Sequence, residues 1–153
     1  MSGAPAGVRV LAVDAQAGQG LRMKVLRPWQ PPAEPMYALE RDPATAHYAA
    51  LAGDGEVLAV GSVMADPHPR EPRAGDWRVR GMATRPELRG RGLGAMVLRA
   101  LEEHARRGAG QRVWCNARTG ARAFYEREGW STEGEEFEIE RIGPHFVMSK
   151  PLG

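Results

Sequence analysis

The segment RGRGLG, from Arg89 to Gly94, holds three glycines and two arginines and directly precedes an amphipathic helical pattern. Glycine has the most conformational freedom to lose on folding, so this run indicates that bare backbone is needed here. Unpaired N–H groups at a helix N-terminus, supported by the helix dipole, form a favourable site for a phosphate or another anion. Arginine side chains add charge-assisted hydrogen bonds to such a group. The segment therefore predicts an anion-binding loop.

Three established designs of anion-binding loop match this segment poorly. A Walker loop needs a lysine and a serine or threonine after the last glycine, where this chain has Ala95 and Met96. A dinucleotide fingerprint lies near the N-terminus and is followed by an acidic residue on the next strand, but this loop is mid-chain and the next strand reads RVWCNA. An Arg-Gly-Gly nucleic-acid segment would be repeated and disordered rather than followed by a regular helix.

The spacing Arg89-x-x-Gly92-x-Gly94 resembles the coenzyme A-binding motif of the GNAT N-acetyltransferase superfamily. The stretch AFYEREGW, from Ala123 to Trp130, is similar to the family's segment after its fifth strand. The order of elements matches over nearly the whole chain. The resemblance implies an α/β fold with a mixed, mostly antiparallel central sheet flanked by helices. It also implies a single N-acetyltransferase domain over residues 1–153, of which we expect residues 1–7 to be flexible.

The resemblance implies transfer of an acetyl group from acetyl-CoA, as cosubstrate, directly to an amine acceptor, either a small molecule or a peptide. It also implies that Tyr125 meets the sulfur of the cofactor, and it makes a homodimer possible. Many relatives have an asparagine seven residues before this tyrosine, where this chain has Arg118, and Asn116 lies two residues earlier. The implied cofactor-binding residues are Met82, Ala83 and Thr84 along the pantetheine arm, Arg89, Gly90, Arg91, Gly92, Leu93 and Gly94 around the pyrophosphate, and Arg118 at the other end.

Acetyl transfer needs an acid for the leaving thiolate, an N–H donor for the oxyanion and a base for the amine. Tyr125 is suited to protonate the departing thiolate, because a tyrosine titrates at about pH 10 and a thiol at about 8.5. The alternative is that Tyr125 is a core aromatic residue with its hydroxyl at the surface. The backbone near Met82, where the central strand splays, is the candidate N–H donor to the oxyanion. The candidate base that deprotonates the amine is His145 rather than His47. The alternatives are that His145 only caps a turn and that a chain of waters removes the proton.

Glutamates alternate with apolar residues near the C-terminus, where Glu136, Glu138 and Glu140 flank Phe137 and Ile139. This alternation places the three glutamates on one face of a strand. We expect that face to be solvated. The alternative is an acidic wall that attracts a cationic amine.

Composition restricts the class of protein. The chain has 21 basic and 19 acidic residues, and its net charge of +2 does not by itself argue for nucleic acid. Cys115 is the one cysteine of the sequence, so we expect no internal disulfide and no cysteine-based zinc cluster, which fits a reducing cytoplasm. We expect Cys115 to be a small buried residue rather than an acylated nucleophile. No signal peptide, membrane-spanning run or metal is expected.

Periodicity and turn signals predict the elements that must position these groups. A GDG turn joins two strands into a hairpin. The helix after the glycine segment should have one apolar face and a polar face that includes Glu102. We expect strands over 8–13, 47–52, 57–64, 77–82, 112–116, 135–141 and 145–150, helices over 16–26, 93–107 and 117–128, and loops over 27–35 and 68–75.

Two other functions stand as alternatives. One is a coenzyme A-binding sensor or regulatory module that keeps the glycine segment without turnover, in which Tyr125 would be dispensable. The other is a basic nucleic-acid-binding domain that uses the central arginines, which predicts a steep dependence of binding on salt. The regular helix after the glycine segment argues against this second alternative.

Overall fold

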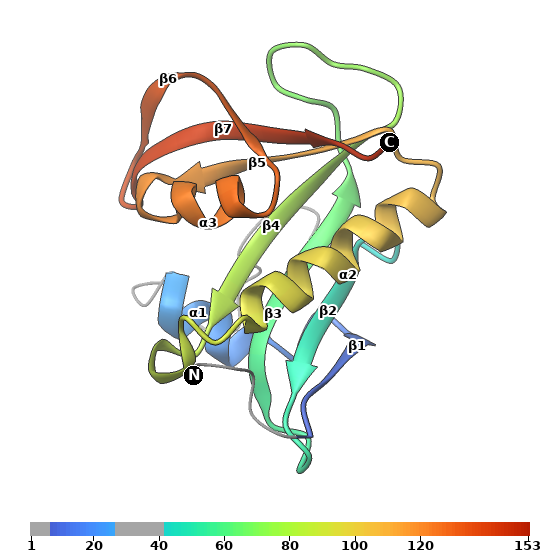
Figure 1. Cartoon of the computed structure of the whole chain (residues 1–153), viewed down its shortest axis with the longest axis vertical. Coiled ribbons are helices and arrows are strands. Elements are labelled where there is room, and N and C mark those ends of the chain that lie inside the picture. Colours follow the sequence, from blue (N-terminus) through green and yellow to red (C-terminus); the bar gives the residue numbers. More distant parts are fainter. Residues whose placement is uncertain (1–6, 27–41) are drawn as a thin grey trace.

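The computed structural model describes residues 7–26 and 42–153 of the chain (Figure 1). The predicted loop over 27–35, with Trp29, and residues 1–6 of the expected flexible segment lie outside the described residues. The described elements form a seven-stranded sheet with helices on both of its faces.

The sheet is mixed and mostly antiparallel, as predicted. Its strands follow the spatial order β1-β2-β3-β4-β5-β7-β6. β4 and β5 pair in parallel, and the other neighbouring strands of the described chain pair antiparallel. The strands are β1 (Arg9–Val13), β2 (Ala46–Leu51), β3 (Val57–Ala65), β4 (Asp76–Thr84), β5 (Arg112–Arg118), β6 (Ser131–Ile139) and β7 (Gly143–Pro151).

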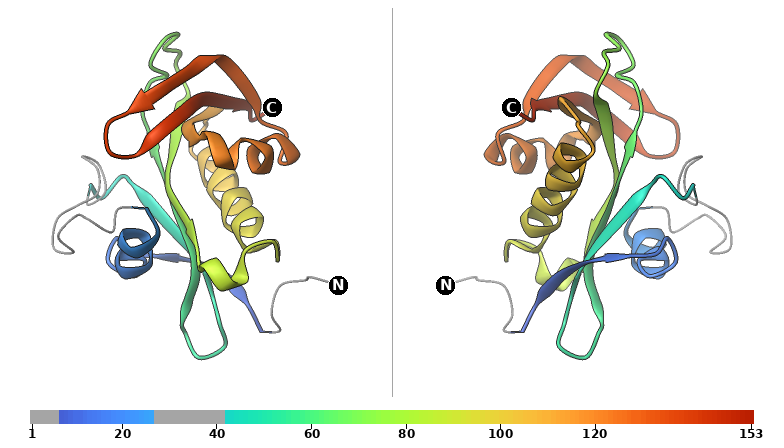
Figure 2. Two further views of the ribbon diagram at one scale, coloured as in Figure 1. Left: turned by 90° about the vertical axis from the view of Figure 1, so that its left-hand side faces the viewer. Right: turned by 90° about the vertical axis from the view of Figure 1, so that its right-hand side faces the viewer.

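The three α-helices of the described residues divide between the two faces. α1 (Gln19–Leu26) covers one face, and α2 (Leu93–Arg107) and α3 (Arg122–Arg127) cover the other (Figure 2). α1 begins three residues later than predicted. The cause is a turn in which the Asp14 carboxylate accepts hydrogen bonds from the backbone N–H groups at positions 16 and 17, since aspartate side chains compete with helix formation in this way.

α2 supplies the centre of the hydrophobic core, and its contribution departs from the prediction at one residue. Glu102 was expected on the polar face, but it is buried (2% exposed). Its carboxylate accepts hydrogen bonds from Trp130 Nε1 at 3.0 Å and from Lys150 Nζ at 2.8 Å. These partners offset the cost of burying the charge, and they join α2 to β7. The buried residues of α2 are Leu93, Val97, Leu98, Leu101, Glu102 and Ala105.

β4 and β5 pair over a short stretch and then separate. Residues 76–78 of β4 lie in register with residues 112–114 of β5, and the described pairing between the two strands ends there. We call this paired end the vertex. Beyond it, β4 continues to the glycine segment, whereas β5 continues alongside β7 to Arg118. The two central strands therefore diverge like the arms of a V.

A bulge interrupts β4 within the diverging part. Two residues of β4, Gly81 and Met82, lie opposite the single residue Gly61 of β3. Gly81 has φ +64°, a left-handed conformation that glycine adopts without steric cost. A bulge disrupts the ladder locally and leaves backbone groups unpaired. The bulge thus makes backbone N–H groups available near the middle of β4.

The predicted helix over 117–128 was wrong at its start. Strand β5 continues to Arg118, and a 3-10 turn over Thr119–Ala121 comes before the six residues of α3. The pairing of β5 with β7 extends to Arg118 and His145. Pairing in the sheet therefore overrides the local helical preference of this stretch.

The final hairpin also differs from its predicted bounds. β6 begins at Ser131, four residues earlier than expected, because an irregularity between Glu133 and Phe137 takes up extra residues on that strand. The turn comes just before Gly143 rather than around Ile142-Gly143-Pro144, with Arg141 at φ +68°. Gly143 and Pro144 already belong to β7.

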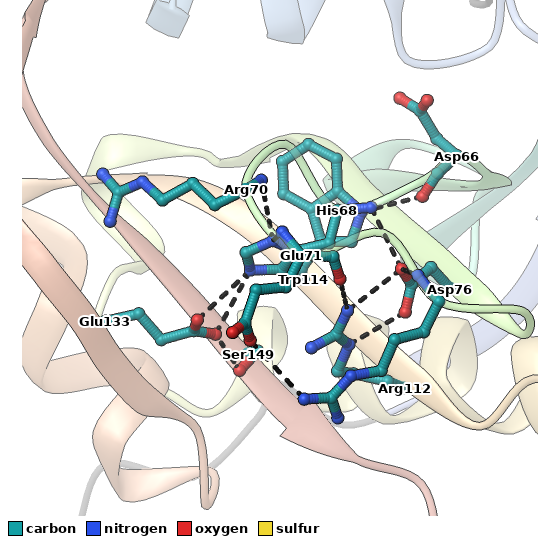
Figure 3. Close-up of polar contacts among 10 residues, drawn as sticks. Asp66, His68, Arg70, Glu71, Asp76, Arg112, Trp114, Glu133 and Ser149 are labelled. Atoms are coloured by element: carbon teal, nitrogen blue, oxygen red, sulfur yellow. Dashed lines mark hydrogen bonds and ion pairs between the residues drawn. The ribbon is translucent and has the colours of Figure 1, made fainter.

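A polar network fixes the vertex to the loop over 66–75 (Figure 3). Arg112 donates two hydrogen bonds to the Asp76 carboxylate, at 2.8 and 3.0 Å, and a third to the Glu71 carbonyl at 2.7 Å. The buried His68 accepts backbone hydrogen bonds on Nδ1 from residues 70 and 71, so its Nε2–H is left to donate to Glu133, 3.3 Å away. The loop is therefore held against β5 and β6.

Candidate active site

A cleft of 770 Å³ lies between the diverging strands β4 and β5. One end is formed by the glycine segment and the other by residues of the β6–β7 hairpin. Of the twelve residues expected in the site, Arg91 is exposed and does not line the cleft. The structure brings together the other eleven: Met82, Ala83, Thr84, Arg89, Gly90, Gly92, Leu93, Gly94, Arg118, Tyr125 and His145.

The glycine segment leads the chain from β4 into α2. Gly90 and Gly92 both have φ +81°, which a residue with a side chain adopts only with strain. A Cβ at either position would meet nothing within 4 Å, so both glycines present bare backbone to open space. Gly92 is the N-cap of α2, and no side chain of the described residues caps the helix there. The first N–H groups of α2 are therefore available to an anion.

Three elements meet beside this loop. A Cβ at Gly94 would lie 3.5 Å from both the Phe124 ring and Thr84 Oγ1, so the end of β4, the start of α2 and α3 are in close contact. Leu93 is 1% exposed and anchors the loop in the core. Arg89 lines the cleft at the same end. This end combines backbone donors, a guanidinium and an apolar wall.

Tyr125 lines the cleft from α3. It is 6% exposed, and its hydroxyl is hydrogen-bonded with the thiol of Cys115, which also lines the cleft. The hydroxyl therefore points inward rather than to the surface. Burial raises the pKa of Tyr125 well above its ordinary value and raises the pKa of Cys115 to about 12. Both groups stay protonated at neutral pH, so Tyr125 can donate a proton and Cys115 is a poor nucleophile.

His145 is placed differently from the other candidate base. His145 is 4% exposed and lines the cleft, whereas His47 lies in β2 outside the cleft lining, with Nδ1 at 2.6 Å from Ser62 Oγ. His145 Nδ1 lies 2.7 Å from the carbonyl of Gly143. Because a carbonyl only accepts, Nδ1 carries the proton and Nε2 keeps a lone pair. Burial lowers the pKa of His145, which favours this neutral form.

Arg118 and Asn116 both line the cleft from β5. Alternation along the strand places their side chains on the face opposite to Cys115. Arg118 Nη2 donates to the Leu26 carbonyl at the end of α1, at 2.7 Å. Asn116 Oδ1 is buried and has no hydrogen-bond partner among the described residues. The amide oxygen of Asn116 is thus an acceptor that a ligand in the cleft can use.

The three alternating glutamates near the C-terminus lie outside this site. Glu136, Glu138 and Glu140 are exposed, and none of them lines the cleft. The expected solvated face is confirmed. An acidic wall in the cleft is not formed by these residues.

Sequence reasoning missed the buried polar residues behind the bulge of β4. Arg22 of α1 is 0% exposed and donates through Nε to the carbonyl of Gly81. The signal for its burial was its place in α1, four residues after Gly18 and three before Val25, on the stripe that faces the sheet. Phe124 was also missed as a wall of the cleft, although it precedes Tyr125 in the quoted motif.

Two further findings concern sites of other kinds. Among residues 7–26 and 42–153, no three or more histidine, cysteine, aspartate or glutamate side chains gather as a metal ion would require. None of the described helices has the length and apolar character needed to cross a membrane.

Comparisons with known proteins agree with this architecture. The sequence model of the acetyltransferase (GNAT) family matches residues 19–130. The chain is 30% identical over 145 residues to the uncharacterized N-acetyltransferase YitI of Bacillus subtilis, across 95% of this chain and 97% of that protein. Its fold is similar to that of Escherichia coli ElaA (TM-score 0.75, 17% identity, 94% of this chain and 99% of that one). It is also similar to an acyl-CoA N-acyltransferase of Pseudomonas aeruginosa (TM-score 0.67, 24% identity, 94% and 99%). The chain therefore belongs to the GNAT acetyltransferase family.

Proposed function

We propose that this chain transfers an acetyl group from acetyl-CoA directly to an amine, which is a small molecule or a peptide. The observation that carries the proposal is the cleft, whose lining includes the glycine segment at the N-terminus of α2 together with Tyr125 and His145. A pyrophosphate, a thiol and an amine are the three groups that these residues suit, in that order.

The residues at the glycine end fit a pyrophosphate. Gly90 and Gly92 turn bare backbone toward open space, and the helix N-terminus adds N–H donors and the positive end of its dipole. Arg89 supplies a guanidinium, which forms bidentate bonds with phosphate oxygens. Met82, Ala83 and Thr84 would run alongside the pantetheine arm. Arg91 is better suited to a contact at the rim, since it lies outside the cleft lining.

Tyr125 would protonate the leaving sulfur. Its hydroxyl lies beside the Cys115 thiol, and both residues line the cleft. Because burial raises the pKa of Tyr125, its proton is retained throughout the range in which an amine is neutral enough to react. When the hydroxyl turns its one proton to the leaving sulfur, the S–H of Cys115 would donate to the Tyr125 oxygen instead.

His145 would remove the proton of the amine through Nε2. The Gly143 carbonyl holds the tautomer, and the lowered pKa keeps the ring neutral at pH 7. Asn116 Oδ1 would accept a second hydrogen bond from the amine, since it is buried and lacks a partner among the described residues. Acetyl-CoA, when bound, supplies an acetyl thioester. A backbone N–H at the bulge of β4 would donate to its carbonyl oxygen.

The remaining features of the proposal concern where and with what the protein works. The single cysteine, Cys115, is a free thiol, which fits a cytoplasmic location. A homodimer is compatible with the family. We propose no role for nucleic acid or a metal.

The test is turnover of acetyl-CoA over a panel of amines, followed as release of free thiol and as acetylated product by mass spectrometry. Wild type should acetylate at least one amine, and Tyr125→Phe should lower kcat by about 10²–10⁴-fold, the usual contribution of a general acid. Thermal stability should change little, because phenylalanine fills the same space. Binding of acetyl-CoA without turnover on any amine would favour the catalytically silent sensor instead.

A further inference from the structure

Arg22 is a fully buried cation close to the reaction centre. Its Nε donates to the carbonyl of Gly81 at 3.0 Å, and its Nη2 donates to Ser62 Oγ at 3.0 Å. Ser62 is 0% exposed and is held in turn by His47, whose Nδ1 lies 2.6 Å away. These bonds join α1, β2 and β3 to the bulge of β4.

We propose that Arg22 is a positioning residue for acetyl transfer. It fixes the backbone at Gly81 and Met82 so that an N–H of the bulge is aimed at the thioester carbonyl. The inference rests on the function proposed above. Arg22 does not line the cleft, so it acts through the backbone and not by touching the reactants.

Arg22 packs closely against Gly81. A Cβ built at Gly81 would lie only 2.5 Å from Arg22 Nε and 3.0 Å from its Cδ. The left-handed conformation of Gly81 and the guanidinium therefore fit each other, and neither has room to change alone. Glycine has the most backbone freedom of any residue, so a bulge built on it needs an external constraint to hold one geometry. The hydrogen bond to its carbonyl supplies that constraint.

Burial of an arginine at this position needs an explanation, because burying a guanidinium costs free energy unless its donors are satisfied. An apolar side chain of similar volume would fill the same space without that cost. What an apolar side chain lacks is a rigid planar fork that donates from two nitrogens to acceptors on two strands. Gly18 seats α1 at a fixed distance, since a Cβ there would be 2.5 Å from Val60. The helix therefore presents the fork in one position.

The experiment compares Arg22→Met and Arg22→Lys with Lys24→Met, a matched control at an exposed position of the same helix. The first readout is the infrared stretch of the ¹³C-labelled thioester carbonyl of bound acetyl-CoA, whose frequency falls when an N–H polarises it. The second is the split between kcat and the KM for acetyl-CoA, with an amine that wild type accepts.

Arg22→Met should lose most of the frequency shift on binding and lower kcat by about 10- to 100-fold, since removing an oxyanion donor outright costs about 10²–10³-fold. The KM for acetyl-CoA should stay within about threefold, because the glycine segment is intact. Arg22→Lys should fall in between, and Lys24→Met should match wild type. If Arg22→Met does not fold, Ser62→Ala removes one anchor of the guanidinium and should give a smaller shift and a smaller kcat in the same direction.

Two results would overturn the inference in distinguishable ways. An unchanged carbonyl shift and an unchanged kcat in Arg22→Met would leave Arg22 with a structural role alone. Absence of acetyl-CoA binding by wild type, or binding without any carbonyl shift, would remove the proposed function on which the inference rests.

Discussion

Replacing Asp76 with asparagine should destabilise the fold by about 2–4 kcal/mol. Burial alone would raise the pKa of Asp76, but hydrogen bonds from the Arg112 side chain and from the N–H groups of Arg73 and His68 outweigh it and lower the pKa from 3.8 to about 2. A fall of this size corresponds to about 2.4 kcal/mol, at about 1.36 kcal/mol per pH unit. Removing one partner of a buried ion pair typically costs about 3–5 kcal/mol, because the other charge is left uncompensated.

The same shift sets the pH dependence of this stability. A carboxyl group whose pKa is lowered by folding stabilises the protein fully above its unfolded pKa, and this contribution is lost as the pH falls through its folded pKa. The contribution of Asp76 is therefore complete above about pH 5, about half lost at pH 3 and absent below about pH 1. The difference in stability between wild type and Asp76→Asn should shrink accordingly on acidification.

Urea unfolding followed by tryptophan fluorescence at pH 7 and pH 3 measures both quantities. The variant should also melt roughly 5–15 °C lower at pH 7, at about 2–4 °C per kcal/mol for this chain length. Glu71→Gln is the matched control from the same loop: its ion pair with Arg73 spans 3.5 Å between side chains that are 67% and 64% exposed, so its loss should cost below about 1 kcal/mol. A variant within about 0.5 kcal/mol of wild type, or an equal deficit at both pH values, would refute this account of the vertex.

The remaining predictions concern the cleft. His145→Gln should lower kcat/KM by about 10²–10⁴-fold at neutral pH. It should also abolish the acidic limb of the pH profile, which in wild type lies below the ordinary histidine pKa of 6.5 because burial lowers the pKa of His145. Persistence of the same limb in the variant would exclude His145 as the base. Gly92→Ala should weaken acetyl-CoA binding, measured by calorimetry, because alanine resists φ +81°. Gly55→Ala, at φ +88° in the β2–β3 turn, should carry a similar loss of stability with acetyl-CoA affinity unchanged, and equal affinity losses in the two variants would contradict a specific role for Gly92.

Local signals predicted much of the fold. The GDG turn gave the β2–β3 hairpin, and Gly55 has the positive φ that such a turn needs. The helical spacing of apolar residues between Leu93 and Ala105 predicted α2. In the structure Leu93, Ala105 and apolar residues between them are buried. The glycines at 90 and 92 do adopt left-handed conformations ahead of the helix. Each of these features depends on residues within a few positions of one another.

The predictions were wrong at positions whose burial or strand pairing depends on residues far away in the sequence. Glu102 looked like a surface residue because its partners, Trp130 and Lys150, lie far along the chain. The end of β5 looked helical because the strand that pairs with it follows almost thirty residues later. Arg22 showed only a weak signal, and its role depends on a bulge that no local pattern reveals. Burial of charge and the register of the sheet are tertiary properties, so periodicity alone does not predict them.

The resemblance to a family predicted the residues of the site more accurately than hydrophobic periodicity did. It brought forward eleven residues that line one cleft, although their roles remain proposals. It did not bring forward Cys115 as the hydrogen-bond partner of Tyr125, because residue type alone suggested a small core residue. Likewise, the open acceptor on Asn116 follows from burial in the folded chain and not from its place in the motif.

The central claim is that acetyl-CoA binds in the cleft through the glycine segment. A thermal-shift titration of the wild-type chain with acetyl-CoA, with ATP as the control, tests it most directly. At about a hundred times the dissociation constant the ligand should add about 2.7 kcal/mol, which raises the melting temperature by roughly 5–11 °C. A clear rise with acetyl-CoA and little with ATP is the predicted result. No rise at millimolar acetyl-CoA would contradict the account.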